Sequence, residues 1–300
     1  KEGNLKVTYD GAMSYTTNYK YLDMLDSQDY MNYANTFKKE LYMYKNGMGI
    51  YGGKTYDNGS ADAYSASEIS AATTTNWRDM ILRDGSTSSH NITIQGGTPK
   101  LQYYLSGNYY YQKGSVQNSA MERFTLRSNV ASQLTSFAKL TTTLNYNKNT
   151  NHNGSVGGSS NGRGSQADGS LAAAMTYLPT LPIYDSTGAY TCFLTVPNPI
   201  GMLDMTDKTL GEGFNMNFTL DIDIIKNMLK ARGLFGYNRE TSDRYVYIPT
   251  TTYYDQIMGQ SRGSTQHAFR DNSTLEGMLM FNKGFGELMN LDAVIGMGRY

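Results

Sequence analysis

Apolar and polar residues alternate with a period of two over long stretches of the chain. In the first stretch Leu5, Val7 and Tyr9 alternate with polar residues. Such alternation predicts β-strands that have one apolar and one polar side. The same pattern recurs in the ranges 91–96, 101–112, 123–134, 138–147, 214–224, 229–238, 273–283 and 288–299.

The expected strands are long. They reach about 10 to 13 residues where about 5–6 is usual, and a tilted strand that crosses a bilayer needs about 9–11. Their polar sides carry charges at mid-strand, which suits a water-filled lumen better than the interior of a small sandwich. One polar side brings Asp221 and Asp223 opposite Lys230 and Arg232, which we interpret as a neutralised ladder of charges rather than a catalytic acid pair.

The connections alternate between short and long. Tight turns at 97–100, 135–136 and 226–228 alternate with the long links 17–90, 113–120, 148–212 and 242–272. An up-and-down barrel in an outer membrane has this arrangement, with short turns on one side and large loops outside. The sequence therefore predicts an all-β fold, a partial transmembrane antiparallel barrel of about nine strands with long extracellular loops. Because bacterial barrels use even strand numbers, we expect these strands to belong to a larger barrel.

Short helices are expected within the long loops. Apolar spacing predicts a helix over 26–45 that Asp26 would cap, and a second helix that starts near Asn76 and stops before Gly85. Residues 171–177 allow one or two further helical turns. Segment 148–170 is rich in Gly, Ser and Asn, which predicts a flexible connection.

Composition narrows the class of protein. Lys plus Arg total 26 and Asp plus Glu total 26, so no charge excess points to nucleic acid. Tyrosine is abundant at 26 residues and suits strands that face two different solvents. A single cysteine excludes a disulfide framework. No run approaches the roughly 20 apolar residues of a membrane-spanning helix, and no signal peptide is expected within the chain.

Motifs for catalysis or cofactor binding are missing from the sequence. The three histidines have no metal-ligand spacing, and a hydrogen-bonding role is expected for His90. No nucleophile elbow and no phosphate-binding glycine loop is found. We therefore expect no catalytic residue, no metal, no cofactor and no enzymatic activity.

Aromatic residues in the expected outer loops are the candidate binding residues. Rings can stack on sugar faces, and equally they can pin loops to one another or to a partner protein. From this group the best candidates for substrate contact are Trp77, Tyr184, Tyr190, Tyr245 and Tyr247. The wider group also includes Tyr51, Tyr56, Tyr64, Tyr253 and Tyr254.

Several motifs in order along the chain resemble one family. They are NWRDMILR at 76–83, HNITIQGG at 90–97, YYLSGNY at 103–109, RFTLRSN at 123–129, YLPTLPIYD at 177–185 and NP at 198–199. Together they resemble the SusC/RagA family of TonB-dependent outer-membrane transporters of Bacteroidetes. The similarity covers nearly the whole chain.

The resemblance implies a place, partners and a function. Residues 1–300 would form a single partial barrel domain, with the plug, the TonB box and the C-terminal strands lying outside it. The whole protein would import oligosaccharides or peptides across the outer membrane, energised by the TonB complex and capped by a SusD-like lipoprotein. Two alternatives are a barrel enzyme, which the scarcity of histidine opposes, and a secreted or surface-exposed carbohydrate-binding or adhesive β protein.

Overall fold

The protein is built around one antiparallel sheet of nine strands, seen in a computed structural model that describes residues 3–17, 22–154, 169–193, 196–252, 259–285 and 289–300. The strands are β1 Gly3–Thr16, β2 Gly85–Gly97, β3 Leu101–Lys113, β4 Ala120–Gln133, β5 Ala138–His152, β6 Thr206–Ile225, β7 Leu229–Ile248, β8 Arg262–Phe285 and β9 Met289–Arg299. The helices are α1 Ser27–Asn46, α2 Ala66–Ala71, α3 Trp77–Ile81 and α4 Ser170–Thr176, with 3-10 turns at Gly49–Tyr51 and Gly201–Asp204. Among the described residues, no helix combines the length and the apolar character that crossing a membrane would require.

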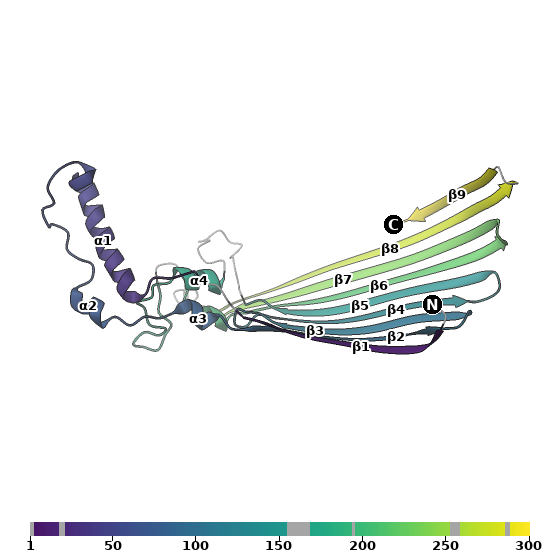
Figure 1. Cartoon of the computed structure of the whole chain (residues 1–300), viewed down its shortest axis with the longest axis horizontal. Coiled ribbons are helices and arrows are strands. Elements are labelled where there is room, and N and C mark those ends of the chain that lie inside the picture. Colours follow the sequence, from purple (N-terminus) through teal and green to yellow (C-terminus); the bar gives the residue numbers. More distant parts are fainter. Residues whose placement is uncertain (1–2, 18–21, 155–168, 194–195, 253–258, 286–288) are drawn as a thin grey trace.

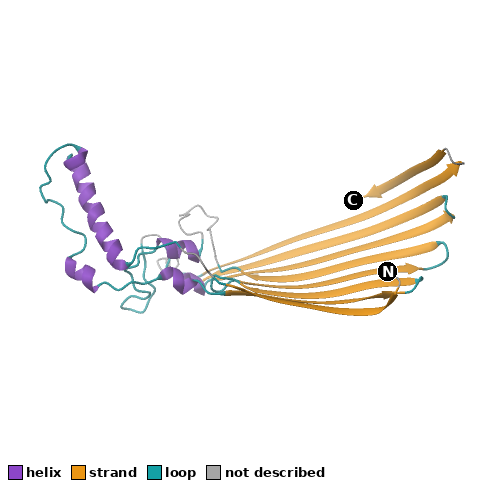
Figure 2. Ribbon diagram, in the orientation of Figure 1, coloured by secondary structure: helices purple, strands orange, loops and turns teal. Residues whose placement is uncertain are grey.

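Strand order in the sheet follows the order along the chain, from β1 at one edge to β9 at the other. Every neighbouring pair is antiparallel, and β1 does not pair with β9. The helices gather at one end of the strands, and short turns occupy the opposite end (Figures 1 and 2). The sheet is therefore an open, up-and-down part of a barrel, as the alternation of link lengths predicts.

The register brings the apolar residues of different strands onto one face. Val7 pairs with Ile94, which pairs with Leu105. Similar rows continue across the sheet, because cross-strand partners lie on the same side. We call this side the apolar face.

The opposite side, the polar face, carries a row of amides. The amides of this row, from β5 to β8, belong to the successive cross-strand partners Asn145, Asn215, Asn238 and Asn272. The guanidinium of Arg127 on β4 precedes them. On this face Arg232 donates two hydrogen bonds to Asp221, at 2.6 and 3.1 Å. Lys230 lies 3.7 Å from Asp223. These pairs confirm the expected ladder of neutralised charges.

The sheet has no dry core. Leu5 is 64% exposed, Val7 60% and Leu101 44%. Among the described residues, every buried hydrophobic side chain lies outside the strands, in the helices and long loops. Folding therefore leaves a wide apolar surface uncovered, which monomeric soluble proteins rarely do.

Several strands extend further toward the helical end than the sequence predicts. β6 begins at Thr206 rather than 214, β7 ends at Ile248 rather than 238, and β8 begins at Arg262 rather than 273. In much of these extensions polar residues occupy both sides of the strand, as in TDKTLGE at 206–212 and RETSDR at 239–244. A hydrophobic period marks a strand only where one side is apolar, so these regions were wrongly expected to be loops.

The helices begin and end where capping residues are found. Asp26 accepts a hydrogen bond from the amide of Asp29, and Gly47 ends α1 with a positive φ of 63°. Asn76 caps α3. The expected helices are thus confirmed, whereas α2 was not anticipated although Ser65 and Glu68 form a capping box. Most of the expected flexible segment 148–170 lies outside the described residues, and its first five residues belong to β5.

Candidate functional site

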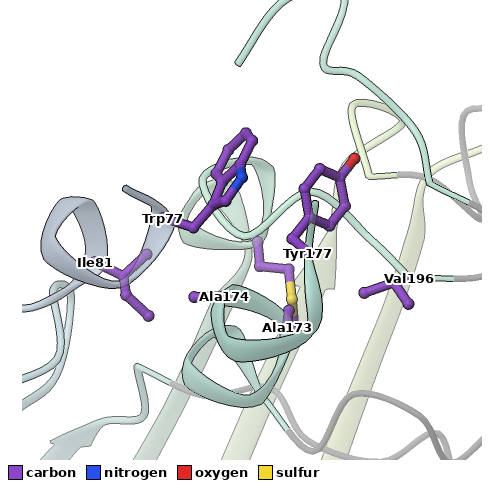
Figure 3. Packing of buried hydrophobic residues seen from close by; sticks show 7 residues of the cluster. Trp77, Ile81, Ala173, Ala174, Tyr177 and Val196 are labelled. Carbon is purple, nitrogen blue, oxygen red and sulfur yellow. The ribbon is translucent and has the colours of Figure 1, made fainter. Parts of the chain in front are cut away.

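The two longest loops share a small hydrophobic core at the helical end of the sheet. Trp77 and Ile81 of α3 pack with Ala173 and Ala174 of α4 and with Tyr177, as Figure 3 shows. The rings of Trp77 and Tyr177 are 4.8 Å apart at 72°, an edge-on contact. The Trp77 indole N–H donates to the carbonyl of Leu178 at 2.9 Å. Trp77 is only 3% exposed, so its ring joins two loops and has no free face for a ligand.

Asn198 holds the second of these loops in place from inside. Its side-chain amide donates to the carbonyl of Ile183 at 3.1 Å, and its side-chain oxygen accepts from the amide of Ile200 at 3.0 Å. Asn198 is 3% exposed. The Asn-Pro pair of the sequence pattern therefore has a structural role, because a buried amide must find partners for its polar atoms.

Tyr184 and Tyr190 form a stacked pair on the same loop. Their ring centroids are 5.0 Å apart and their planes differ by 27°. An isolated β-bridge joins the two residues around a turn in which Asp185 accepts from the amides of Thr187 and Ala189. Hydrogen bonds from Thr187 lower the pKa of the Asp185 carboxyl. The turn therefore holds the two rings in register.

Tyr190 is fixed more firmly than Tyr184. Its hydroxyl donates to Asp204 at 3.0 Å, and Gly201 lies against its ring, where a Cβ atom would come within 3.0 Å. Burial raises the pKa of Tyr190, and the hydrogen bond to Asp204 raises it further. Tyr184 is 50% exposed, so it presents an aromatic surface on a rigid support.

We predicted that Tyr245 and Tyr247 lie in a loop. This was wrong, because both residues lie in β7. Tyr245 pairs with Lys208 of β6 and Thr265 of β8. Both tyrosines occupy the odd positions of β7, like Phe235 of the apolar face, and they are 43% and 49% exposed. The structure thus separates them from the polar face. Tyr253 and Tyr254 lie outside the described residues.

An ion pair with a buried carboxylate lies on the polar face near the loops. Arg244 donates to both carboxylate oxygens of Asp207, at 2.9 and 2.5 Å. Asn153 donates to the same carboxylate at 3.1 Å. Burial alone would raise the pKa of Asp207, but the hydrogen bonds from Arg244 and Asn153 outweigh it and lower the pKa. This pair ties β6 to β7 just where the strands meet the loops.

A shallow cavity of about 390 Å³ opens beside this pair on the polar face. Gly211 and Gly213 of β6 line it together with residues of β5, β7 and β8. A Cβ atom on Gly213 would come within 2.5 Å of the Asn147 amide, so the glycine leaves room for that side chain. The polar lining comes from Asn147, Asn149, Glu240, Ser242 and Arg270.

The sequence did not reveal this cavity. The range 148–212 was expected to be a loop, yet Asn149 and Gly211 are cross-strand partners in regular β-structure. Two sequence patterns could have indicated the cavity, namely Asn-x-Asn at 147–149 and Gly-x-Gly at 211–213. In a strand, alternate residues lie on the same face. Of the five predicted binding residues, the structure brings Tyr184 and Tyr190 together and gives Trp77 a packing role. Among the described residues, no group of side chains has the composition of a metal site.

Comparison with known proteins identifies relatives of one kind. No protein-family model matches the chain. TonB-dependent receptor P3 of Formosa agariphila is 29% identical over 230 residues, which cover 75% of this chain and 22% of that protein. TonB-dependent receptor SusC of Bacteroides thetaiotaomicron is 27% identical over 187 residues, 61% of this chain and 15% of that protein. The chain thus spans about a fifth of the length of the first of these relatives.

The fold has a counterpart among solved structures. A chain of the RagAB peptide importer in its closed-closed state superposes with a TM-score of 0.68 and 16% identity, over 99% of this chain and 34% of that one. This likeness establishes the fold, and the two curated receptors establish the kinship in sequence. The chain is therefore similar in sequence to TonB-dependent receptors, SusC among them, and its nine strands have the fold of part of the RagAB chain.

Proposed function

We propose that the chain forms part of the wall and the outer loops of an outer-membrane importer of nutrient oligomers. The observation that carries this proposal is the register of the sheet, which gathers apolar side chains on one face and a row of amides on the other. A wall with these two faces separates lipid from a water-filled lumen. We place residues 1–300 in one barrel domain of a protein that also has a plug and further strands.

The relatives support our choice of partners. SusC and RagAB are named as receptor and peptide importer, and we propose the same arrangement here, with a SusD-like lipoprotein over the outer loops and the TonB complex acting through the plug. The substrate is an oligosaccharide or a peptide. The exposed ring of Tyr184, backed by Tyr190, is our candidate for first contact with it. No bond is made or broken in this process, so the protein is a transporter and not an enzyme.

Extraction and uptake test the proposal. The full-length protein should partition with the outer membrane, require detergent for extraction, and migrate differently on a gel before and after boiling. Cells that lack it should lose uptake of one class of labelled oligomer. A native protein that is soluble in plain buffer would overturn the proposal and favour a secreted carbohydrate-binding protein.

A further inference from the structure

We propose that the cavity on the polar face between β5 and β8 is a binding subsite for short peptides with free termini. This inference rests on the proposed import function and names the substrate class of that wall. The cavity is a shallow hollow with a volume of about 390 Å³. Its position on the amide-lined face would put it in the path of a substrate that crosses the lumen.

Two oppositely charged side chains line the cavity. Glu240 of β7 and Arg270 of β8 are direct cross-strand neighbours, yet within the described part of the chain neither side chain forms an ion pair or hydrogen bond. On the opposite face of the same two strands, Arg239 lies 3.7 Å from Asp271. Nearby charges on the polar face are also paired, as in Asp207 with Arg244. Glu240 and Arg270 are thus available to a ligand that carries both charges.

The remaining lining suits amides. Asn147 and Asn149 supply both donors and acceptors, and Ser242 supplies a hydroxyl. A peptide offers the matching set, with an ammonium group for Glu240, a carboxylate for Arg270 and main-chain amides for the asparagines. Guanidinium and carboxylate groups form the stronger, charge-assisted hydrogen bonds.

The described residues that line the cavity offer no stacking surface for sugar rings. Phe269 is the aromatic residue of its lining, and it is the cross-strand partner of Thr241, whose row continues through Glu212 and Lys148 to Phe124 on the apolar side. Its side chain therefore belongs to the opposite face of the sheet. Saccharide sites usually combine polar groups with an aromatic platform, so the lining favours peptide over glycan at this position.

Binding of defined probes tests the inference. The full-length protein, purified in detergent with its lipoprotein partner, is titrated calorimetrically with tri-alanine, its C-terminal amide, its N-acetyl form and maltotriose. We expect Arg270→Gln to weaken binding of tri-alanine about tenfold and to abolish the difference between tri-alanine and its amide. Glu240→Gln should likewise weaken binding of tri-alanine about tenfold, and it should abolish the difference between tri-alanine and its N-acetyl form. Arg239→Gln, on the other face, is the matched control and should bind tri-alanine normally.

A further variant keeps both charged side chains and fills the cavity at Gly211. Gly211→Val would place a side chain where Asn149 now lies, and it should weaken all tri-alanine forms together. Unchanged affinities in Arg270→Gln, Glu240→Gln and Gly211→Val, or equal sensitivity of maltotriose, would overturn the inference. A shift on boiling verifies the barrel in each variant. If the protein still imports oligomers while these affinities stay unchanged, the subsite alone is refuted.

Discussion

At the scale of single residues, Trp77 carries the contact between two loops that are far apart in sequence. Replacing it with alanine removes a buried ring and the hydrogen bond to Leu178. We expect Trp77→Ala to cost about 3 kcal/mol of the free energy that keeps the cluster closed. Limited proteolysis of the outer loops in the membrane-embedded protein should then become about a hundredfold faster. Tyr33→Ala, at a position 60% exposed on α1, is the control and should leave the rate unchanged.

Asp207 gives the loop end of the sheet a dependence on pH. Its pKa is lower in the folded protein, so it stabilises the fold above its unfolded pKa of about 3.9, and this contribution is lost as pH falls through the folded pKa. Asp207→Asn should lower stability by about 1–3 kcal/mol at pH 7. Thermal melts of the full-length protein should show the two forms converging toward pH 2. A constant difference down to that pH would contradict the role of the ion pair with Arg244.

At the scale of elements, neighbouring residues of β4 face different surroundings. Leu126 lies on the apolar face beside Tyr146, and Thr125 lies on the polar face beside Asn147. If the apolar face contacts lipid, Leu126→Lys should cost about 2–4 kcal/mol of folding free energy in the membrane, whereas Thr125→Lys should be tolerated. The folded fraction of the full-length protein, measured by its gel shift on boiling, decides between them. Equal loss in both variants would mean that the two faces are not different solvents.

The strands also show which parts of the fold could be predicted from the sequence. Strands with one apolar side, such as β3 and β4, were predicted within three residues because their apolar and polar residues alternate there. The polar extensions of β6, β7 and β8 were missed, and with them the cavity between Asn149 and Gly211. Tyr245 and Tyr247 were placed in a loop for the same reason. The shared core of Trp77 and Tyr177 depends on packing between distant segments, which no local pattern encodes.

At the scale of the whole molecule, β1 and β9 are the edges of the sheet and each has one unpaired side among the described residues. Unpaired edges and an uncovered apolar face both promote association. We expect residues 1–300 alone to form aggregates or higher oligomers in detergent-free buffer. Size-exclusion chromatography with light scattering should show no sharp monomer peak, and a monodisperse monomer would contradict this expectation.

Helices α3 and α4 pack against each other in one small core. The segment that connects β1 to β2 and the one that connects β5 to β6 contribute opposite halves of the same core. A chimera that borrowed only one of them from a homologue would inherit mismatched halves. We therefore expect these two connecting segments to change together during evolution, because each must keep packing against the other.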